Sequence, residues 1–350
     1  MSIPPLRVLV IDDSAYNRRK LTEMLESSRE LEVVGKAGDG DEALRLVTNL
    51  RPDVITLDLE MPRMDGFTFL RILMAKQPTP VVVVSSYSQK ENVFKALELG
   101  ALDFVAKPDR RILQDTDELR EKLISKVLMV RNLRLVAQPA EPSRPSQPLS
   151  FGDKVAQPSG PPRHVVVVAA STGGPSAVLE IFARLPPALP IAVLVAQHMP
   201  EKFTRTFAER LDRRSGLRVI EAQDFDGVEA HMGFVCPGRQ CMELAHLPHT
   251  NELRLRVVLP GPNDRYVPSA DRLFRSAAKA MGGQLTGIVL TGMGDDGTEG
   301  ARAIREAGGT VIAESEESAV VYGMPGSVIR AGLANRILSL PEIVEYVAAL

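Results

Sequence analysis

The residues in the first third of the chain that are best suited to chemistry each stand where a buried apolar run ends. They are Asp12, Asp13, Asp58, Ser85 and Lys107. If these runs are parallel strands, their carboxyl ends meet in one crevice, and three carboxylates then share one pocket. Such crowding is unfavourable unless a cation lies among the carboxylates, and hard oxygen ligands suit Mg2+. Asp58 could then attack phosphorus, while Ser85 and Lys107 bond the transferred oxygens.

Each of these residues has a simpler interpretation when it is taken alone. Asp58 could be a turn residue at a strand end, and Lys107 could be a solvated charge. Five matched positions favour a phosphoacceptor site instead.

A second group of residues is typical of acyl transfer. Ser171 ends the apolar run of HVVVVAASTGGPSAV, His198 ends IAVLVAQH, and Asp296 follows IVLTG. His198 could accept the serine proton while Asp296 orients the imidazole, and amides around 172–176 could stabilise an oxyanion. A phosphate-binding turn or a helix cap at Ser171, and a structural His198, are the alternatives. Asp295 competes with Asp296 for the orienting role.

The elements that position the first group alternate between apolar runs and helical patterns. Strands are expected over 6–12, 31–37, 53–59, 80–86 and 102–107, and helices from Ser14, Asp41, Gly66 and Glu91 and over 117–133. Such alternation predicts a doubly wound α/β domain, with a parallel sheet covered by helices on both faces.

The same alternation resumes in the second half of the chain. Strands are expected over 164–171, 191–198, 218–222, 233–237, 253–259, 285–292 and 309–314, and helices after Pro175 and Pro200, from Ser269 and near Thr298. The helix after Pro200 places Phe203, Phe207 and Leu211 at a spacing of four residues. These patterns predict a second parallel-sheet α/β domain.

Between the two halves, seven prolines lie among small and polar residues. Such a composition is typical of a linker. The sequence therefore predicts a first domain over 1–134, a linker over 135–163 and a second domain over 164–350.

Composition narrows the function classes. With a formal net charge of −2 over 350 residues, the chain lacks the basic surplus of most nucleic-acid-binding proteins, so we expect no nucleic-acid partner. No apolar run is long enough to span a membrane and no secretion signal is evident, so we expect a cytoplasmic protein without membrane insertion. The two cysteines, Cys236 and Cys241, lack the additional ligands of a zinc site and are expected to be free thiols.

Four segments of the first half resemble motifs of the response-regulator receiver family, across roughly residues 6 to 125. They are VIDDS, DVITLDLEMPRMDG, VVVVSSYS and DFVAKP. The resemblance implies a flavodoxin-like receiver in which Asp58 is the phosphoacceptor. It also implies that Asp12 and Asp13 hold Mg2+ together with Asp58, that Ser85 is the switch hydroxyl, and that Lys107 is its partner.

The second half resembles the chemotaxis protein-glutamate methylesterase family, over about residues 164 to 345. The similarity is carried by AASTGGP, QHMP, PSADRLFRSAA and LTGMGDDG. It implies a Rossmann-like three-layer domain whose catalytic triad is Ser171, His198 and Asp296, with no cofactor for the esterase. The family commonly has Asn where this chain has Asp295.

Together, the two resemblances imply a hydrolase controlled by phosphorylation. It would release methanol from glutamate methyl esters on the cytoplasmic helices of chemoreceptors, and would deamidate receptor glutamines. A chemotaxis histidine kinase would phosphorylate Asp58, and the unphosphorylated receiver would cover the esterase cleft. Two other classes stay open from the residues alone: a response regulator whose second domain only binds a partner, and a dinucleotide-dependent oxidoreductase that lacks the usual glycine fingerprint.

Overall fold

The computed structural model describes residues 4–86, 90–107, 116–133, 160–187, 189–250, 252–262 and 264–350. The chain divides into two compact units, Met1–Leu133 and Arg134–Leu350. Most of the linker predicted over 135–163 lies outside the described residues.

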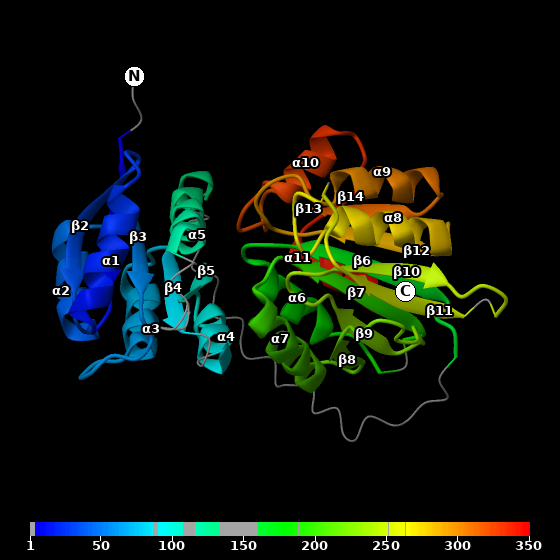
Figure 1. The fold of residues 1–350 in the computed structure, drawn as a ribbon, viewed down its shortest axis with the longest axis horizontal. Coiled ribbons are helices and arrows are strands. Elements are labelled where there is room, and N and C mark those ends of the chain that lie inside the picture. Colours follow the sequence, from blue (N-terminus) through cyan, green and yellow to red (C-terminus); the bar gives the residue numbers. More distant parts are fainter. Residues whose placement is uncertain are drawn as a thin grey trace. The chain divides into compact units, whose positions relative to one another are not determined.

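The first unit is built on a five-stranded parallel sheet with the strand order β2-β1-β3-β4-β5 (Figure 1). The strands are β1 (Leu6–Ile11), β2 (Leu31–Ala37), β3 (Val54–Leu57), β4 (Val81–Ser86) and β5 (Asp103–Lys107). Every residue of β3 is buried, as is typical of a strand covered on both faces. The five strands expected from the sequence are all present, which confirms the doubly wound fold.

Helices cover both faces of this sheet. They are α1 (Ala15–Glu26), α2 (Gly40–Leu50), α3 (Gly66–Lys76), α4 (Lys90–Glu98) and α5 (Thr116–Leu128), followed by the 3-10 helix η2 (Met129–Asn132). The expected helix start at Asp41 is too late, because the Asp39 side chain accepts the Glu42 N–H at 2.8 Å and so caps α2. The helix expected over 117–133 becomes the tighter η2 after Leu128.

The second unit contains a seven-stranded parallel sheet with the order β14-β13-β12-β6-β7-β9-β8. Its strands are β6 (His164–Ala170), β7 (Ile191–Gln197), β8 (Arg218–Glu221), β9 (Met232–Val235), β12 (Leu285–Val289), β13 (Thr310–Glu314) and β14 (Arg336–Leu338). The strand order reverses at β6, since β7 lies on one side of it and β12 on the other. Ligand sites of open α/β sheets lie at the carboxyl ends of strands beside such a reversal.

Two helical layers enclose this sheet (Figure 1). One contains α8 (Ala270–Met281), α9 (Thr298–Glu306) and α10 (Met324–Arg330), and the other contains α6 (Gly174–Phe182), α7 (Glu201–Arg214) and α11 (Leu340–Ala348). Helix α7 follows Pro200 as predicted and buries Phe203, Phe207 and Leu211. Ser269 caps α8 by accepting the Arg272 N–H at 3.3 Å.

Some elements of the second unit differ from the expectation. The expected strand over 253–259 is β11 (Leu253–Val258), but it leaves the main sheet and pairs in antiparallel fashion with β10 (Cys241–His246). The sequence patterns predicted neither β10 nor the elements α10, β14 and α11.

Cys236 and Cys241 are buried free thiols. Among the described residues, no helix is both long and apolar enough to cross a membrane.

Candidate functional site

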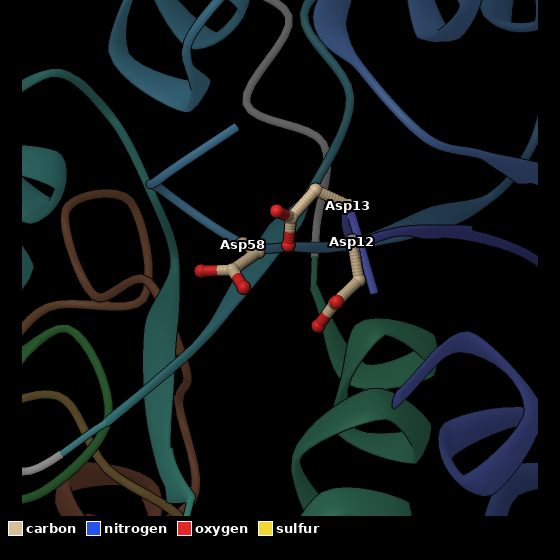
Figure 2. Close-up of side chains that lie close together, drawn as sticks. All are labelled: Asp12, Asp13 and Asp58. Atoms are coloured by element: carbon tan, nitrogen blue, oxygen red, sulfur yellow. The ribbon is translucent and has the colours of Figure 1, made fainter. Parts of the chain in front are cut away.

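The carboxyl edge of the first sheet gathers the acidic side chains predicted from the sequence. Asp12 and Asp13 follow β1, and Asp58 follows β3; one carboxylate oxygen from each lies within 4.8 Å of the others (Figure 2). Asp12 is fully buried and Asp58 nearly so, whereas Asp13 is exposed. Such a set of hard oxygen donors could hold a metal ion.

Lys107 reaches two of these carboxylates from the end of β5. Its Nζ lies 2.7 Å from Asp12 Oδ2 and 2.6 Å from Asp58 Oδ2. Burial raises the pKa of Asp58, and the Lys107 ammonium opposes that rise without cancelling it. Burial alone would lower the pKa of Lys107, but the two carboxylates outweigh it and the pKa is raised. Ser85 is fully buried within β4, which lies between β3 and β5 in the sheet.

Local contacts fix the orientation of two of the carboxylates. Asp12 Oδ1 accepts the Ser14 N–H at 2.9 Å and the Asn17 Nδ2 donor at 3.2 Å, so the first turn of α1 holds it in place. Asp58 Oδ1 accepts the N–H of Leu59 at 2.7 Å. Asn17 was not predicted from the sequence, although its position three residues after the Ser14 cap is a signal that could have identified it.

In the second unit, Ser171 follows β6 at the reversal of strand order. Its N–H donates to Thr291 O at 3.1 Å, and its carbonyl oxygen accepts from Gly174 N at 2.9 Å and from Gln197 Nε2 at 2.8 Å. Gly173 has a φ of 76°, and a Cβ on Gly174 would overlap the Gln197 side chain and lie 2.7 Å from Ala170 Cβ, so this tight turn into α6 needs glycine at both positions. The Gly174 amide, expected among the oxyanion donors, is used within the turn.

His198 and Asp296 reach the same edge from the neighbouring strands. His198 follows β7, and its backbone N–H donates to Ala170 O at 3.0 Å, which places it beside Ser171. Its Nε2 lies 2.8 Å from Asp296 Oδ2. Because carboxylate oxygens accept hydrogen bonds, we assign the ring proton to Nε2, which leaves Nδ1 as the acceptor nitrogen. Among the described residues, no hydrogen bond joins Ser171 Oγ to the imidazole.

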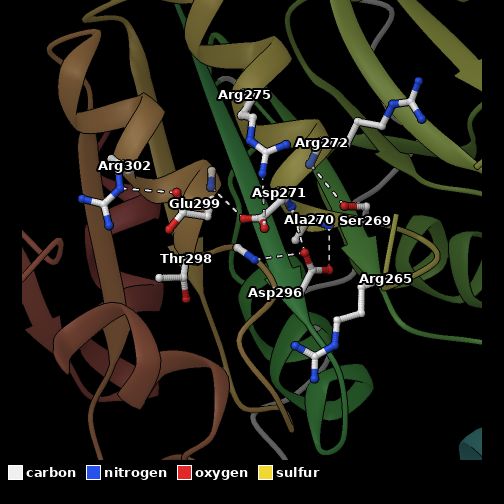
Figure 3. A network of polar contacts seen from close by, with 12 residues as sticks. Arg265, Ser269, Ala270, Asp271, Arg272, Arg275, Asp296, Thr298, Glu299 and Arg302 are labelled. Carbon is white, nitrogen blue, oxygen red and sulfur yellow. Dashed lines mark hydrogen bonds and ion pairs between the residues drawn. The ribbon is translucent and has the colours of Figure 1, made fainter. Parts of the chain in front are cut away.

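Asp296 is the most strongly held of these side chains. It is 1% exposed, and its Oδ2 accepts the Ala270 N–H at 2.8 Å, while Oδ1 accepts from Asp271 N at 3.0 Å and Gly297 N at 3.1 Å (Figure 3). Two of these amides belong to the first turn of α8, where the helix dipole favours negative charge. Backbone N–H donors therefore replace the water molecules that would solvate this carboxylate if it were exposed.

Asp271 ties this arrangement to the next helix. Its Oδ1 accepts the Gly300 N–H of α9 at 2.7 Å, so the starts of α8 and α9 are joined beside Asp296 (Figure 3). Burial raises the pKa of Asp271, and the nearby Asp296 charge adds to the rise.

Asp295, which the sequence left as a competitor, points elsewhere. Its side chain is 54% exposed and accepts the Tyr266 hydroxyl at 2.8 Å, with Arg265 Nη1 at 3.4 Å. The structure thus brings Asp296, and not Asp295, to His198.

Sequence reasoning missed two residues behind Ser171. Thr291 Oγ1 donates to Thr172 O at 2.9 Å and accepts the Val321 N–H at 2.9 Å, while Thr291 N donates to Glu314 Oε2 at 2.7 Å. Glu314 ends β13 and is 1% exposed; burial raises its pKa. A glutamate at the end of the apolar run VIAE is the sequence signal that could have identified it.

Comparison with known proteins identifies both units. Residues 166–347 match the family described as CheB methylesterase, and residues 8–119 match the response regulator receiver domain. A protein-glutamate methylesterase/protein-glutamine glutaminase of Geobacter sulfurreducens is 49% identical, covering 97% of this chain and 95% of its own. One from Myxococcus xanthus is 48% identical, covering 99% and 97% respectively.

A solved structure agrees with these sequence matches. The methylesterase catalytic domain of Thermotoga maritima CheB has a TM-score of 0.51 and 36% identity, covering 53% of this chain and 97% of its own. Both resemblances inferred from the sequence motifs are confirmed. The chain belongs to the CheB methylesterase family and carries a response regulator receiver domain ahead of the methylesterase domain.

Proposed function

We propose that this chain is a protein-glutamate methylesterase and protein-glutamine glutaminase of chemotaxis, activated by phosphorylation of its receiver, with Ser171, His198 and Asp296 as its catalytic triad. The support for the activity is the near-full-length similarity to relatives of that name. The single observation that best supports the triad is the 2.8 Å contact of His198 Nε2 with Asp296, beside Ser171.

The proposed reaction proceeds through an acyl-enzyme. Ser171 Oγ attacks the side-chain carbonyl of the substrate glutamate ester, and His198 Nδ1 takes the serine proton. The imidazolium then gives that proton to the leaving methoxide, so methanol departs. Water, deprotonated by the same imidazole, releases the glutamate and restores Ser171. With a glutamine substrate, ammonia leaves in place of methanol.

Asp58 is the proposed phosphoacceptor, and Asp12, Asp13 and Asp58 are the proposed ligands of Mg2+. The fit of Mg2+ to this site rests on the chemistry of the donors, which are all carboxylate oxygens, one of them exposed to solvent on Asp13. When bound, the cation would neutralise charge on the incoming phosphoryl group. Lys107, which already spans Asp12 and Asp58, would shift to a phosphoryl oxygen, with Ser85 as the switch hydroxyl.

The remaining parts of the proposal concern organisation and partners. The receiver would cover 1–134, the linker 135–163 and the esterase 164–350, with no cofactor in the esterase. The partners would be a chemotaxis histidine kinase and the methylated cytoplasmic helices of chemoreceptors, in the cytoplasm and without nucleic acid or membrane insertion. The unphosphorylated receiver would cover the esterase cleft.

The test is methanol release from methylated receptor by the full chain, with and without an acyl-phosphate donor. Ser171→Ala and His198→Ala should each lower turnover on the order of 10⁴ to 10⁶-fold, as loss of a triad member does. Thr250→Ala, which alters an exposed hydroxyl residue in the turn between β10 and β11, is the matched control and should keep full turnover. If Ser171→Ala keeps more than about a tenth of wild-type turnover, the nucleophile is misassigned.

A further inference from the structure

Tyr266 covers one face of the proposed catalytic histidine. The ring centroids of Tyr266 and His198 lie 5.3 Å apart, and the two planes are only 7° from parallel. The tyrosine precedes the Ser269 cap of α8, so it comes from the same segment that supplies backbone donors to Asp296. One segment therefore contacts His198 directly through a ring and indirectly through a carboxylate.

Three contacts fix the Tyr266 ring in this position. Its hydroxyl donates to Asp295 Oδ1 at 2.8 Å, and burial together with this hydrogen bond raises the pKa of the phenol. The Arg265 guanidinium lies 5.2 Å from the centre of the same ring. A Cβ on Gly294, where φ is 92°, would overlap the Tyr266 hydroxyl. The turn before Asp295 therefore leaves room for the tyrosine because residue 294 is glycine.

The hydrogen bond to Asp296 leaves one motion of the imidazole unrestrained. It holds the Nε2 corner, but the ring can still tilt about the line from Nε2 to Asp296, and a tilt redirects Nδ1, the nitrogen proposed to take the Ser171 proton. A parallel ring against one face opposes this motion. It also removes water from that face, and the His198 side chain is only 17% exposed.

We propose that Tyr266 is a positioning residue for His198, and that Asp295 acts on the reaction only through Tyr266. This inference rests on the proposed role of His198 as the base. The two consecutive aspartates then have different roles. Asp296 binds Nε2 at the edge of the His198 imidazole, and Asp295 binds the hydroxyl of Tyr266, whose ring stacks on the face of that imidazole. Tyr266 touches no reacting atom in this arrangement, so it should affect kcat and leave KM unchanged.

Four variants of the full chain test the proposal, with kcat and KM measured separately by methanol release. Tyr266→Leu removes both the ring and its hydrogen bond to Asp295, which we call the tether. We expect kcat to fall ~10- to 100-fold, the cost of a misplaced catalytic group. Tyr266→Phe removes only this hydrogen bond, and Asp295→Ala removes its acceptor together with an exposed ion pair to Arg265. For each variant we expect kcat to fall about two- to tenfold, the equivalent of one net hydrogen bond, because exposed ion pairs contribute little. Asp295→Asn keeps an oxygen acceptor for the Tyr266 hydroxyl and should therefore keep wild-type kcat. In every variant KM should stay within about twofold, because ground-state binding is not involved.

The double variant Tyr266→Phe with Asp295→Ala tests the tether itself. If both residues act through one hydrogen bond, the double variant is no slower than the worse single variant. If Tyr266→Leu fails to fold, this comparison still tests whether the hydrogen bond between Tyr266 and Asp295 affects kcat. Phe225→Leu is the matched control, since Phe225 is an exposed aromatic with Arg256 5.3 Å from its ring centre, beside β11, and it should keep wild-type kcat.

The inference is overturned if folded Tyr266→Leu keeps kcat within twofold of wild type, or if its loss is in KM alone, since Tyr266 would then contact substrate. Additive losses in the double variant would overturn the Asp295 tether. His198→Ala, measured in parallel, separates this inference from the proposed function. Wild-type turnover in that variant would refute the function, whereas an inactive His198→Ala beside fully active Tyr266 variants would refute the positioning role alone.

Discussion

Replacing Asp296 by asparagine tests the hydrogen bonding of the buried carboxylate. An amide offers one oxygen and one NH2 group, whereas the two oxygens of Asp296 each accept from two donors. If the NH2 took the Oδ1 position, it would face the N–H groups of Asp271 and Gly297. Each buried donor left unpaired costs about 1–3 kcal/mol, so this orientation costs ~2–6 kcal/mol.

The other orientation costs less in stability but more in catalysis. With the NH2 at the Oδ2 position, His198 could switch tautomer and accept at Nε2, which leaves only the Ala270 N–H unpaired, a cost of ~1–3 kcal/mol. Nδ1 would then carry the proton and could not accept one from Ser171. We therefore expect Asp296→Asn to fold, with its free energy of unfolding lowered by ~1–3 kcal/mol. We expect turnover to fall on the order of 10³ to 10⁴-fold, as for a wrong tautomer in other triads.

Urea unfolding followed by circular dichroism measures the first effect, and methanol release measures the second. Asp295→Asn is the matched control for stability: the side chain is half exposed and keeps an acceptor for Tyr266, so its free energy of unfolding should change by less than about 0.5 kcal/mol. An Asp296→Asn protein that unfolds at the wild-type urea concentration and keeps more than about a tenth of its turnover would refute the reasoning.

Three further predictions concern control and pH. Asp58→Asn should abolish labelling by acetyl phosphate while Asp41→Asn, at an exposed position of α2, is labelled normally; labelling of Asp58→Asn would exclude it as the acceptor. A fragment of residues 160–350 should be more active than the unphosphorylated full chain. If the covered state holds ~99% of molecules, phosphorylation must shift the balance by about 2.7 kcal/mol to open half of them; a folded fragment without extra activity would argue against covering. Because burial raises the pKa of Glu314 above 4.5, its neutral form favours folding, and the stability that it contributes at low pH is lost as pH rises through the raised pKa. Glu314→Gln should therefore gain stability relative to wild type as pH rises from 4.5 to 7, and a pH-independent difference in urea midpoint would contradict this.

Much of the fold follows from local signals in the sequence. Pro200 and Ser269 mark the starts of α7 and α8 because the fixed φ of proline and the serine hydroxyl act within one turn of the helix. The largely apolar strands β6 and β7 are fully buried apart from the first residue of β6, as expected for parallel strands. Alternation of these elements was enough to place Ser171 and His198 at one edge of a sheet.

The remaining features depend on contacts between distant segments. Asp295 and Asp296 are adjacent and chemically alike, and only the glycine-rich turn around them and the start of α8 decide which one faces His198. Tyr266 has no motif of its own, because its role depends on a ring contact across 68 residues of chain. The separation of β11 from the main sheet depends on pairing with β10, which the sequence pattern did not reveal.

Apart from His198 Nε2, the donors to Asp296 are the main-chain N–H groups of Ala270, Asp271 and Gly297. A main-chain N–H survives replacement of the side chain that it carries, except by proline. Evolution can therefore change residue 270 to another side chain that fits its buried position without removing the donor at that position. The environment of this carboxylate is thus robust to mutation in a way that a site built from arginine or lysine is not.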